Sequence, residues 1–265
     1  MTGNPFAEEE VAVGSELQPA AHGGFVPSHA GRNAACDPFL TEVHAALRDF
    51  VLRQEFPCLG ARAAFNSGSY ALAVYDELTS DSSTADLCRD LFEFTQSEIR
   101  RASEYATFVA VFHRPENTDE SQFEMAMWQQ LQKLNHADAA HYDWDPSVRS
   151  DPTDPQFSFS FSGQALYVIG MHPNSSREAR RFKWPAMVFN PHEQFEQLRA
   201  DGKWKRMQET IREREVELQG TVNPMLSDFG EKTEARQYSG RAVEEDWRAP
   251  FVPAQTSPGG CPFHR

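Results

Sequence analysis

The sequence predicts an α+β fold: a single domain with a central, mostly antiparallel sheet flanked by helices, and a long irregular C-terminal segment. Three observations predict it. Amphipathic helical patterns alternate with short buried strand patterns, a clear hairpin covers residues 157 to 171, and hydrophobic periodicity weakens from residue 220 onward. A chain of 265 residues with 40% hydrophobic and 24% charged residues can bury one sizeable core.

The domain itself is expected to cover residues 36–251. Residues 1–35 are rich in Gly, Pro, Ala and Glu and show no period, which predicts a disordered or loosely attached N-terminal tail. Residues 252–265 are expected to form a C-terminal tail. Neither an internal repeat nor a linker interrupts the middle of the chain, so we expect one domain.

The first half of the domain should combine helices with buried strands. Asp37 suits an N-cap and Pro38 suits the first helical position, so a helix is expected from there to about residue 55. Ser121 and Glu124 form a capping-box pattern that opens another helix. The other elements expected here are strands at 61–65 and 70–75 joined by a turn at 66–68, a helix at 85–104 and a strand at 107–112.

The second half begins with the clearest hairpin in the chain. Three phenylalanines, at 157, 159 and 161, alternate with serines, Ser162 and Gly163 make the turn, and residues 166–171 return. Ser175 with Glu178 predicts the cap of a short helix. The remaining predictions are a strand at 186–189 and helices at 193–199 and 203–218, the last with Trp204, Met207, Ile211 and Leu218 inward.

Charge and composition exclude several classes of protein. A net charge of −14 disfavours nucleic acid and acidic membrane surfaces as partners, because phosphate groups attract Lys and Arg. The sequence contains no apolar run long enough for a membrane span and no signal peptide, so the expected location is the cytoplasm. The four cysteines fit neither a zinc site nor a disulfide scaffold, and Cys36 and Cys88 are expected to be buried.

His172 and three arginines form the first candidate site. A strand delivers His172 to its end, and a helix opens just after it, in which Arg177, Arg180 and Arg181 lie within one and a half turns of one another. An imidazole can ligate iron and guanidinium groups can pair with propionates, so the cluster suits a haem. The alternative is a histidine at a strand end beside a solvated basic helix face.

Two further stretches are candidates. His192 lies near a helix start where Asn190 can cap, and it either serves a site as a neutral imidazole or packs structurally. Residues 218–241 place polar side chains between turn-forming glycines, which is typical of either a site or a surface loop. At the C-terminus, Cys261 precedes a proline, a pair that can supply a thiolate to haem iron.

At these residues the sequence resembles the YqcI/YcgG family. The motifs that carry the resemblance are FPC at 56–58, FSFSFSGQALYVIGMHP, REARRF, VFNPHEQFEQLR and IREREVELQGTVNPMLSDFGEKTEARQYSGR, and it covers roughly residues 36–251. It implies a haem-dependent enzyme similar to the guanidine and arginine N-hydroxylases of the guanitoxin and D-cycloserine pathways. The chain has Ala249 where the family pattern often places a cysteine.

The resemblance implies an enzyme that uses haem b, O₂ and an external electron donor to N-hydroxylate a guanidine or amine of arginine or a derivative. The expected axial ligand is His172, followed by Cys261, Cys58 and His192. Buried carboxylates would orient a guanidinium, and arginines would bind a carboxylate. The catalytic candidates are Glu231, Glu234, Asp228, Arg236 and Arg241, and Tyr238 is a further cofactor contact.

Two other functions stay open. A haem-binding sensor or carrier would hold the same cofactor without oxygenase activity, and a non-haem protein would bind another metal or none. The arginines beside His172 favour haem, because a hard cation requires converging carboxylates. The oligomeric state is also open, with a homodimer as one arrangement.

Overall fold

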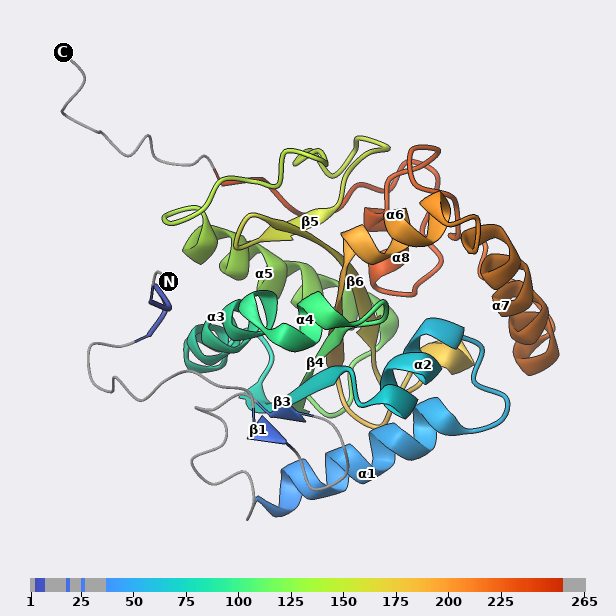
Figure 1. Cartoon of the computed structure of the whole chain (residues 1–265), viewed down its shortest axis with the longest axis horizontal. Coiled ribbons are helices and arrows are strands. Elements are labelled where there is room, and N and C mark those ends of the chain that lie inside the picture. The colour runs from blue at the N-terminus through green and yellow to red at the C-terminus, as the bar shows by residue number, and fades with distance from the viewer. Residues whose placement is uncertain (1–2, 8–17, 20–24, 27–36, 255–265) are drawn as a thin grey trace.

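The domain is built on one mixed sheet. The computed structural model describes residues 3–7, 18–19, 25–26 and 37–254. In these residues the strand order is β1-β2-β3-β4-β7-β6-β5 (Figure 1). Among the five longer strands only β3 and β4 pair in parallel, so the prediction of a mostly antiparallel sheet is confirmed. The strands are β1 (Gln18–Pro19), β2 (Phe25–Val26), β3 (Tyr70–Glu77), β4 (Thr107–Arg114), β5 (Phe159–Phe161), β6 (Gln164–Met171) and β7 (Ala186–Pro191).

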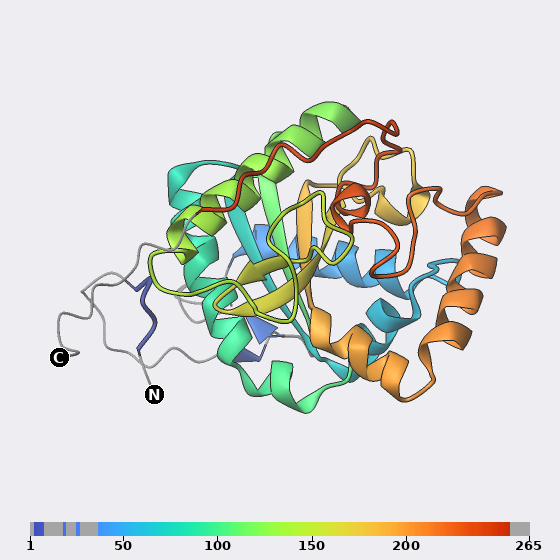
Figure 2. The same cartoon turned by 90° about the horizontal axis from the view of Figure 1, so that it is seen from above.

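Helices cover both faces of this sheet (Figures 1 and 2). The first layer contains α3 (Asp81–Gln96) and α5 (Glu120–Asp138), and the second contains α1 (Pro38–Leu52) and α2 (Leu59–Ser67). In both views α7 stands at the edge of the molecule. The other helical elements are α4 (Glu98–Ala102), η3 (Glu178–Arg180), α6 (His192–Ala200), α7 (Trp204–Gln219) and α8 (Ala235–Tyr238).

Strand alternation divides the core into two clusters. On β4, Phe108, Ala110 and Phe112 belong to the cluster under α3 and α5. Val109 and Val111 belong to the cluster under α1. Successive side chains of a strand point to opposite faces, so a continuous apolar run such as β4 can bury both faces of its sheet.

Local signals in the sequence set several boundaries as predicted. The side chain of Asp37 accepts a hydrogen bond from Phe39 N and begins α1. The hairpin turn is built by Ser162 and Gly163, whose φ angles of 56° and 67° are those of a tight two-residue turn. Cys88 is buried in the core, as expected.

The predicted strand at 61–65 is wrong, because these residues form α2. The Cys58 side chain accepts from Ala61 N at the start of this helix, and Gly68 ends it with φ 71°. The segment is rich in alanine, which favours a helix. The turn residues at 66–68 therefore end a helix rather than join two strands.

Three helix boundaries also differ from the predictions. The helix expected at 85–104 is divided at Ser97, whose extended backbone ends α3 and whose side chain caps α4. The capping box of α5 is formed by Asp119 and Gln122 rather than by the pair two residues later. No side chain caps η3, which is a single 3₁₀ turn, and the expected α-helix after Ser175 is absent there.

The C-terminal segment is irregular, as predicted, but parts of it are buried. Tyr238 and Phe251 belong to the core cluster under α5. Within the predicted N-terminal tail, Phe6 also packs on this cluster, against Phe92 and Phe161. Both ends of the described chain therefore contact the same layer.

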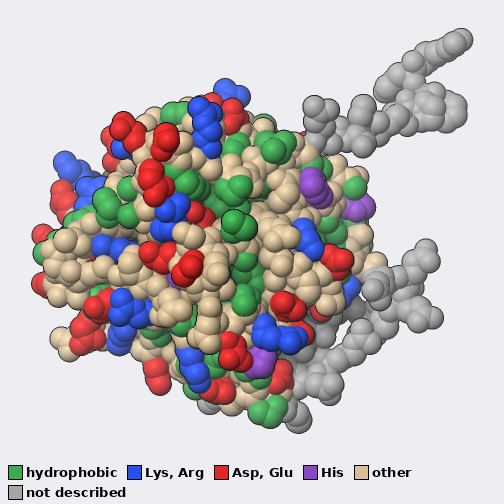
Figure 3. All heavy atoms as spheres, turned by 180° about the vertical axis from the view of Figure 1, so that it is seen from behind, with side chains coloured by type: hydrophobic (Ala, Val, Ile, Leu, Met, Phe, Trp, Pro, Cys, Tyr) green, Lys and Arg blue, Asp and Glu red, His purple; other side chains and the backbone are tan. Residues whose placement is uncertain are grey.

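The surface carries interspersed charges. On the face shown in Figure 3, acidic and basic side chains alternate rather than gather by sign. Among the described residues, none of the helices combines the length and the apolar character needed to cross a membrane.

Asp138 should make stability depend on pH. Its carboxylate accepts from Ser162 N at 2.8 Å, and burial raises its pKa to about 7. An unfolded aspartate has a pKa of about 4, so the folded protein binds this proton more tightly than the unfolded chain. The contribution of Asp138 to the free energy of unfolding should therefore be present near pH 4 and be lost as pH rises to about 7.

Urea unfolding between pH 4 and 8 measures this dependence. Asp138→Asn keeps an acceptor for Ser162 N but cannot ionise, so its free energy of unfolding should fall less over this range than that of the unchanged protein. Asp143→Asn, at an exposed position, is the control. Parallel curves for the unchanged protein and Asp138→Asn would contradict the assignment.

Candidate functional site

A cavity of about 260 Å³ lies on the α1 and α2 side of the sheet. Its floor comes from β4, β6 and β7, and its walls come from α2, α6, α7 and the loop that follows α7. Most of the lining is apolar, which is typical of a site for a small molecule or cofactor. The apolar lining includes Val51, Phe56, Ala61, Phe65, Val109, Ile169, Met171, Val188, Phe195, Leu198, Trp204, Met207, Ile211, Leu226 and Phe229.

Side chains alternate between the two faces of the sheet along β6, and this alternation decides which of them reach the cavity. Tyr167, Ile169 and Met171 line it, so the next residue, His172, turns to the opposite side. There the His172 ring stacks on Phe123 of α5, with ring centroids 4.5 Å apart. It is 1% exposed, and burial lowers its pKa. His172 is therefore a core residue beside the cavity rather than part of its lining.

Helix α7 places its apolar face on the cavity. Trp204, Met207 and Ile211 line the cavity and are half-buried, and none of them belongs to either core cluster. The prediction that these three residues point inward is confirmed, but they face the cavity rather than the core. Leu218, the fourth residue of that prediction, is half-buried and belongs to neither the lining nor a core cluster. Contents of the cavity would therefore complete the packing of this helix.

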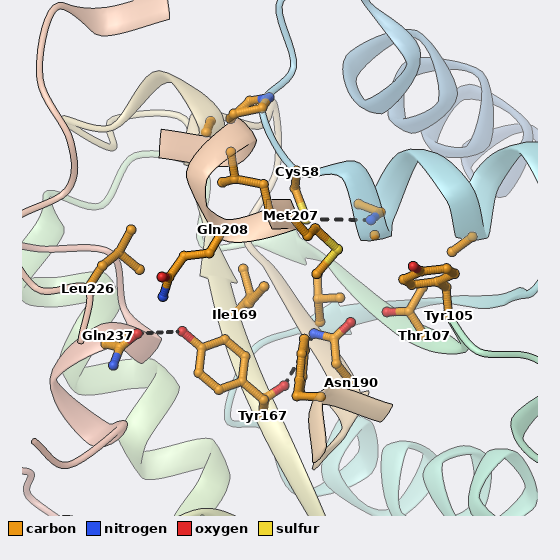
Figure 4. Close-up of a pocket in the computed structure, with 18 of the residues that line it drawn as sticks. Cys58, Tyr105, Thr107, Tyr167, Ile169, Asn190, Met207, Gln208, Leu226 and Gln237 are labelled. Carbon is orange, nitrogen blue, oxygen red and sulfur yellow. Dashed lines mark hydrogen bonds between the residues drawn. The ribbon is translucent and has the colours of Figure 1, made fainter. Parts of the chain in front are cut away.

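Cys58 presents the only described thiol on the cavity wall. It is half-buried at the N-cap of α2, where its Sγ lies 3.5 Å from Ala61 N (Figure 4). Burial raises the pKa of this thiol, while the N–H groups of Ala61 and Gly60 and the charge of Arg180 partly oppose that rise. A metal cation would favour the thiolate further, because a coordinating thiol loses its proton.

The charged lining is more basic than the chain as a whole. Four arginines and two glutamates line the cavity, in a protein whose net charge is −14. Arg177 is 7% exposed, and its Nε is buried without a hydrogen-bond partner. Its Nη1 and Nη2 already donate to Thr221 and Glu215, so Nε is the nitrogen of this guanidinium that has no partner. The six charged residues are Arg177, Arg180, Arg199, Arg212, Glu215 and Glu234.

The arginines differ in what they already bind. Arg180 donates to three backbone carbonyls, those of Gly170, Gln237 and Tyr238, at 3.0 to 3.2 Å. Arg212 makes no hydrogen bond or ion pair with the described residues. Arg180 therefore holds the loop around α8 to β6, whereas Arg212 is available to a bound anion.

Glu234 is the buried carboxylate of the cavity. It is 5% exposed, and its Oε1 lies 3.5 Å from His192 Nδ1. Its Oε2 accepts a hydrogen bond from the Tyr238 hydroxyl at 3.3 Å. The His192 ring packs edge-on against Phe229 and does not line the cavity. Such a carboxylate suits a cationic group of a ligand, because a buried charge requires a partner.

Neutral polar groups continue the wall beside Glu234. The Tyr167 hydroxyl donates to Gln237 Oε1 at 2.9 Å, and Asn190 donates to Tyr167 O at 3.3 Å (Figure 4). Asn190 was expected to cap α6, but Pro191 occupies the N-cap position and no side chain caps that helix. The cavity therefore has one apolar part and one part that can form hydrogen bonds.

The other candidates from the sequence lie outside the lining. Arg181 donates to Ser175 O, and Arg236 donates to the carbonyls of residues 243–245 and 247. Glu231 is exposed, and Arg241 pairs with Glu124 at 2.8 Å. Asp228 is bonded to Gln208 of α7. Tyr238 is fully buried and accepts from Phe159 N. Cys36 and Cys261 fall outside the described residues.

Sequence reasoning missed Arg212, Trp204 and the Tyr167–Gln237 pair as site residues. A signal for the first was present in α7. Arg212 and Glu215 fall on the same helical face as Trp204 and Ile211, so charges interrupt an apolar stripe. Within the described part of the chain, no three His, Cys, Asp or Glu side chains converge as metal ligands.

Comparisons with known proteins give a consistent result. The model of the YqcI/YcgG family matches residues 47–252. The chain is 29% identical over 193 residues to a protein of Bacillus subtilis (strain 168) named "Uncharacterized protein YqcI", covering 69% of this chain and 75% of that protein. No solved structure matches the chain significantly.

Substitutions of Arg180 and Arg212 should have different effects on the free energy of unfolding. Arg180→Gln removes charged donors from three carbonyls and should lower the free energy of unfolding by about 3 kcal/mol in urea. Arg212→Gln should change it by less than about 0.5 kcal/mol. An equally small effect of both substitutions would contradict the structural role of Arg180.

Proposed function

Because this chain belongs to the YqcI/YcgG family, we propose that its cavity binds haem and that the protein is a haem-dependent monooxygenase. The substrate class is a guanidine or amine, carried by arginine or a similar small molecule. The observation that carries the proposal is the composition of one cavity: apolar walls, one thiol at a helix N-terminus, and an excess of two positive charges.

The side chains that line the cavity match a haem in their chemistry. An apolar pocket suits the porphyrin ring, and Cys58 suits the iron as a thiolate ligand. Two carboxylates of haem match the excess of positive charge, with the free Nε of Arg177 and the unpaired Arg212 as their partners. Cys58 replaces His172 as the proposed ligand, because His172 packs against Phe123 instead of lining the cavity.

The reaction defines what the remaining residues must do. When bound, haem iron supplies oxygen activation: O₂, two electrons from an external donor and two protons convert an N–H into N–OH and release one water. The chain's own part is to orient the substrate nitrogen and to exclude water. Glu234 is the proposed partner of a guanidinium or ammonium group, and Tyr167, Asn190 and Gln237 supply hydrogen bonds near it.

Absorbance spectroscopy tests the cofactor and its ligand together. Protein purified with haem available should show a Soret band, and its ferrous carbon monoxide complex should absorb at the position typical of a thiolate ligand. Cys58→Ser should remove the thiolate band, because serine offers no soft ligand. His172→Ala serves as the matched control and should keep that band if it folds.

Other spectra would contradict the proposed ligand, the cofactor or the oxygenase activity. A carbon monoxide band lost in His172→Ala and kept in Cys58→Ser would contradict the ligand. Absence of a Soret band under every loading condition would remove haem. A haem spectrum without substrate-dependent consumption of reductant would favour a sensor or carrier instead.

Glu234→Gln tests the substrate role. The amide keeps the shape but loses the charge, so KM should rise roughly 10- to 100-fold, the range expected for a lost hydrogen bond between charged groups, while the Soret band is unchanged. Glu231→Gln, at an exposed position, should leave KM unaltered. Loss of haem from Glu234→Gln would show that this carboxylate is structural.

A further inference from the structure

The loop before Cys58 is held by arginine side chains through its backbone. Arg62 of α2 donates to the carbonyls of Leu52 and Arg53. Arg214 of α7 donates to the carbonyls of Gln54 and Phe56. The loop has little regular structure, so these bonds define the path of the chain into Cys58.

Arg214 links this loop to the helix that covers the cavity. Its Nε and Nη2 lie 3.3 and 3.1 Å from Phe56 O, two residues before Cys58. Phe56 is itself buried and lines the cavity. A guanidinium that donates several hydrogen bonds to carbonyls fixes orientation as well as distance.

Polar contacts hold helix α7 in position together with the packing of Trp204 on Phe195 of α6. The apolar face of α7 lies on the cavity, and other polar side chains attach it to the segment around η3 and to the loop that follows α7. Glu215 lies 3.4 Å from Arg177 and accepts from Asn223 N, and Gln219 accepts from Glu178 N. A shift of α7 would therefore be transmitted to the Cys58 loop through Arg214.

We infer that Arg214 is a positioning residue, which fixes the Cys58 thiol at the cavity wall and couples its place to that of α7. The inference deepens the proposed function, since Cys58 is the proposed iron ligand. Its physical basis is independent of haem, because every contact of Arg214 described above is formed by the protein alone.

The first test uses cofactor-free protein. Site-resolved labelling of Cys58 with a thiol reagent, followed by mass spectrometry, measures how often the loop opens. Arg214→Gln should label roughly 10- to 100-fold faster, the range expected for the loss of hydrogen bonds to a charged donor. Arg214→Lys should label at an intermediate rate, because lysine keeps the charge but not the fork.

Arg206→Gln is the matched control, since Arg206 is an exposed arginine on the same helix. It should label like the unchanged protein. Circular dichroism verifies that each variant is folded. If Arg214→Gln does not fold, Arg214→Lys decides. Labelling of Cys58 at the unchanged rate in the folded Arg214 variant would overturn the inference.

The second test uses haemin-loaded protein. Arg214→Gln should release haemin at least roughly tenfold faster and show a weaker thiolate-type carbon monoxide band. An unchanged release rate with an unchanged band would count against the inference. If the unchanged protein binds no haemin, the proposed function fails, but the labelling result still decides the role of Arg214.

Discussion

The fold depends on an incomplete hydrophobic layer. On one face of the sheet, α3 and α5 form a closed core with β4, β5 and β6. On the other face, α1 and α2 complete the packing over only part of the sheet, and α7 faces a cavity with its apolar side chains. Burial of this uncovered apolar surface against a bound molecule is favourable. The incomplete packing of this layer is therefore the basis of the site.

Electrostatics then selects what can enter. The chain is strongly acidic, yet the cavity concentrates arginines, including a buried Nε without a partner and a guanidinium free of ion pairs. An apolar molecule with two carboxylates complements both features. Glu234 and its polar neighbours belong to the same wall and add a carboxylate that suits a cationic group.

Much of the fold could be predicted from the sequence because its signals were local. The hairpin, the run of β4 and the amphipathic pattern of α7 depend on periodicity and turn residues, and the structure confirms them. The segment at 61–65 was mistaken for a strand because a short apolar run is ambiguous, and the cap that decides it is a cysteine, an unusual N-cap residue.

The site was harder to predict because it depends on which face of the sheet each side chain of β6 takes and on contacts between residues far apart in sequence. His172 follows Met171, which faces the cavity, so the strand turns the histidine away. The spacing of Arg180 suggested a partner for a propionate. In the structure its guanidinium instead donates to the carbonyls of Gln237 and Tyr238, almost sixty residues away. The sequence placed Cys58 only third among the candidate axial ligands, because nothing near Cys58 in sequence shows that it shares a cavity with residues of α7.

Titration of cofactor-free protein with haemin and with haemin dimethyl ester tests the central claim most directly. The ester keeps the ring and the iron but removes both carboxylate charges. Haemin should bind stoichiometrically and the ester at least roughly tenfold more weakly, because the ester offers Arg177 and Arg212 no charged partner. Failure of haemin to bind, or equal affinity for both compounds, would contradict it.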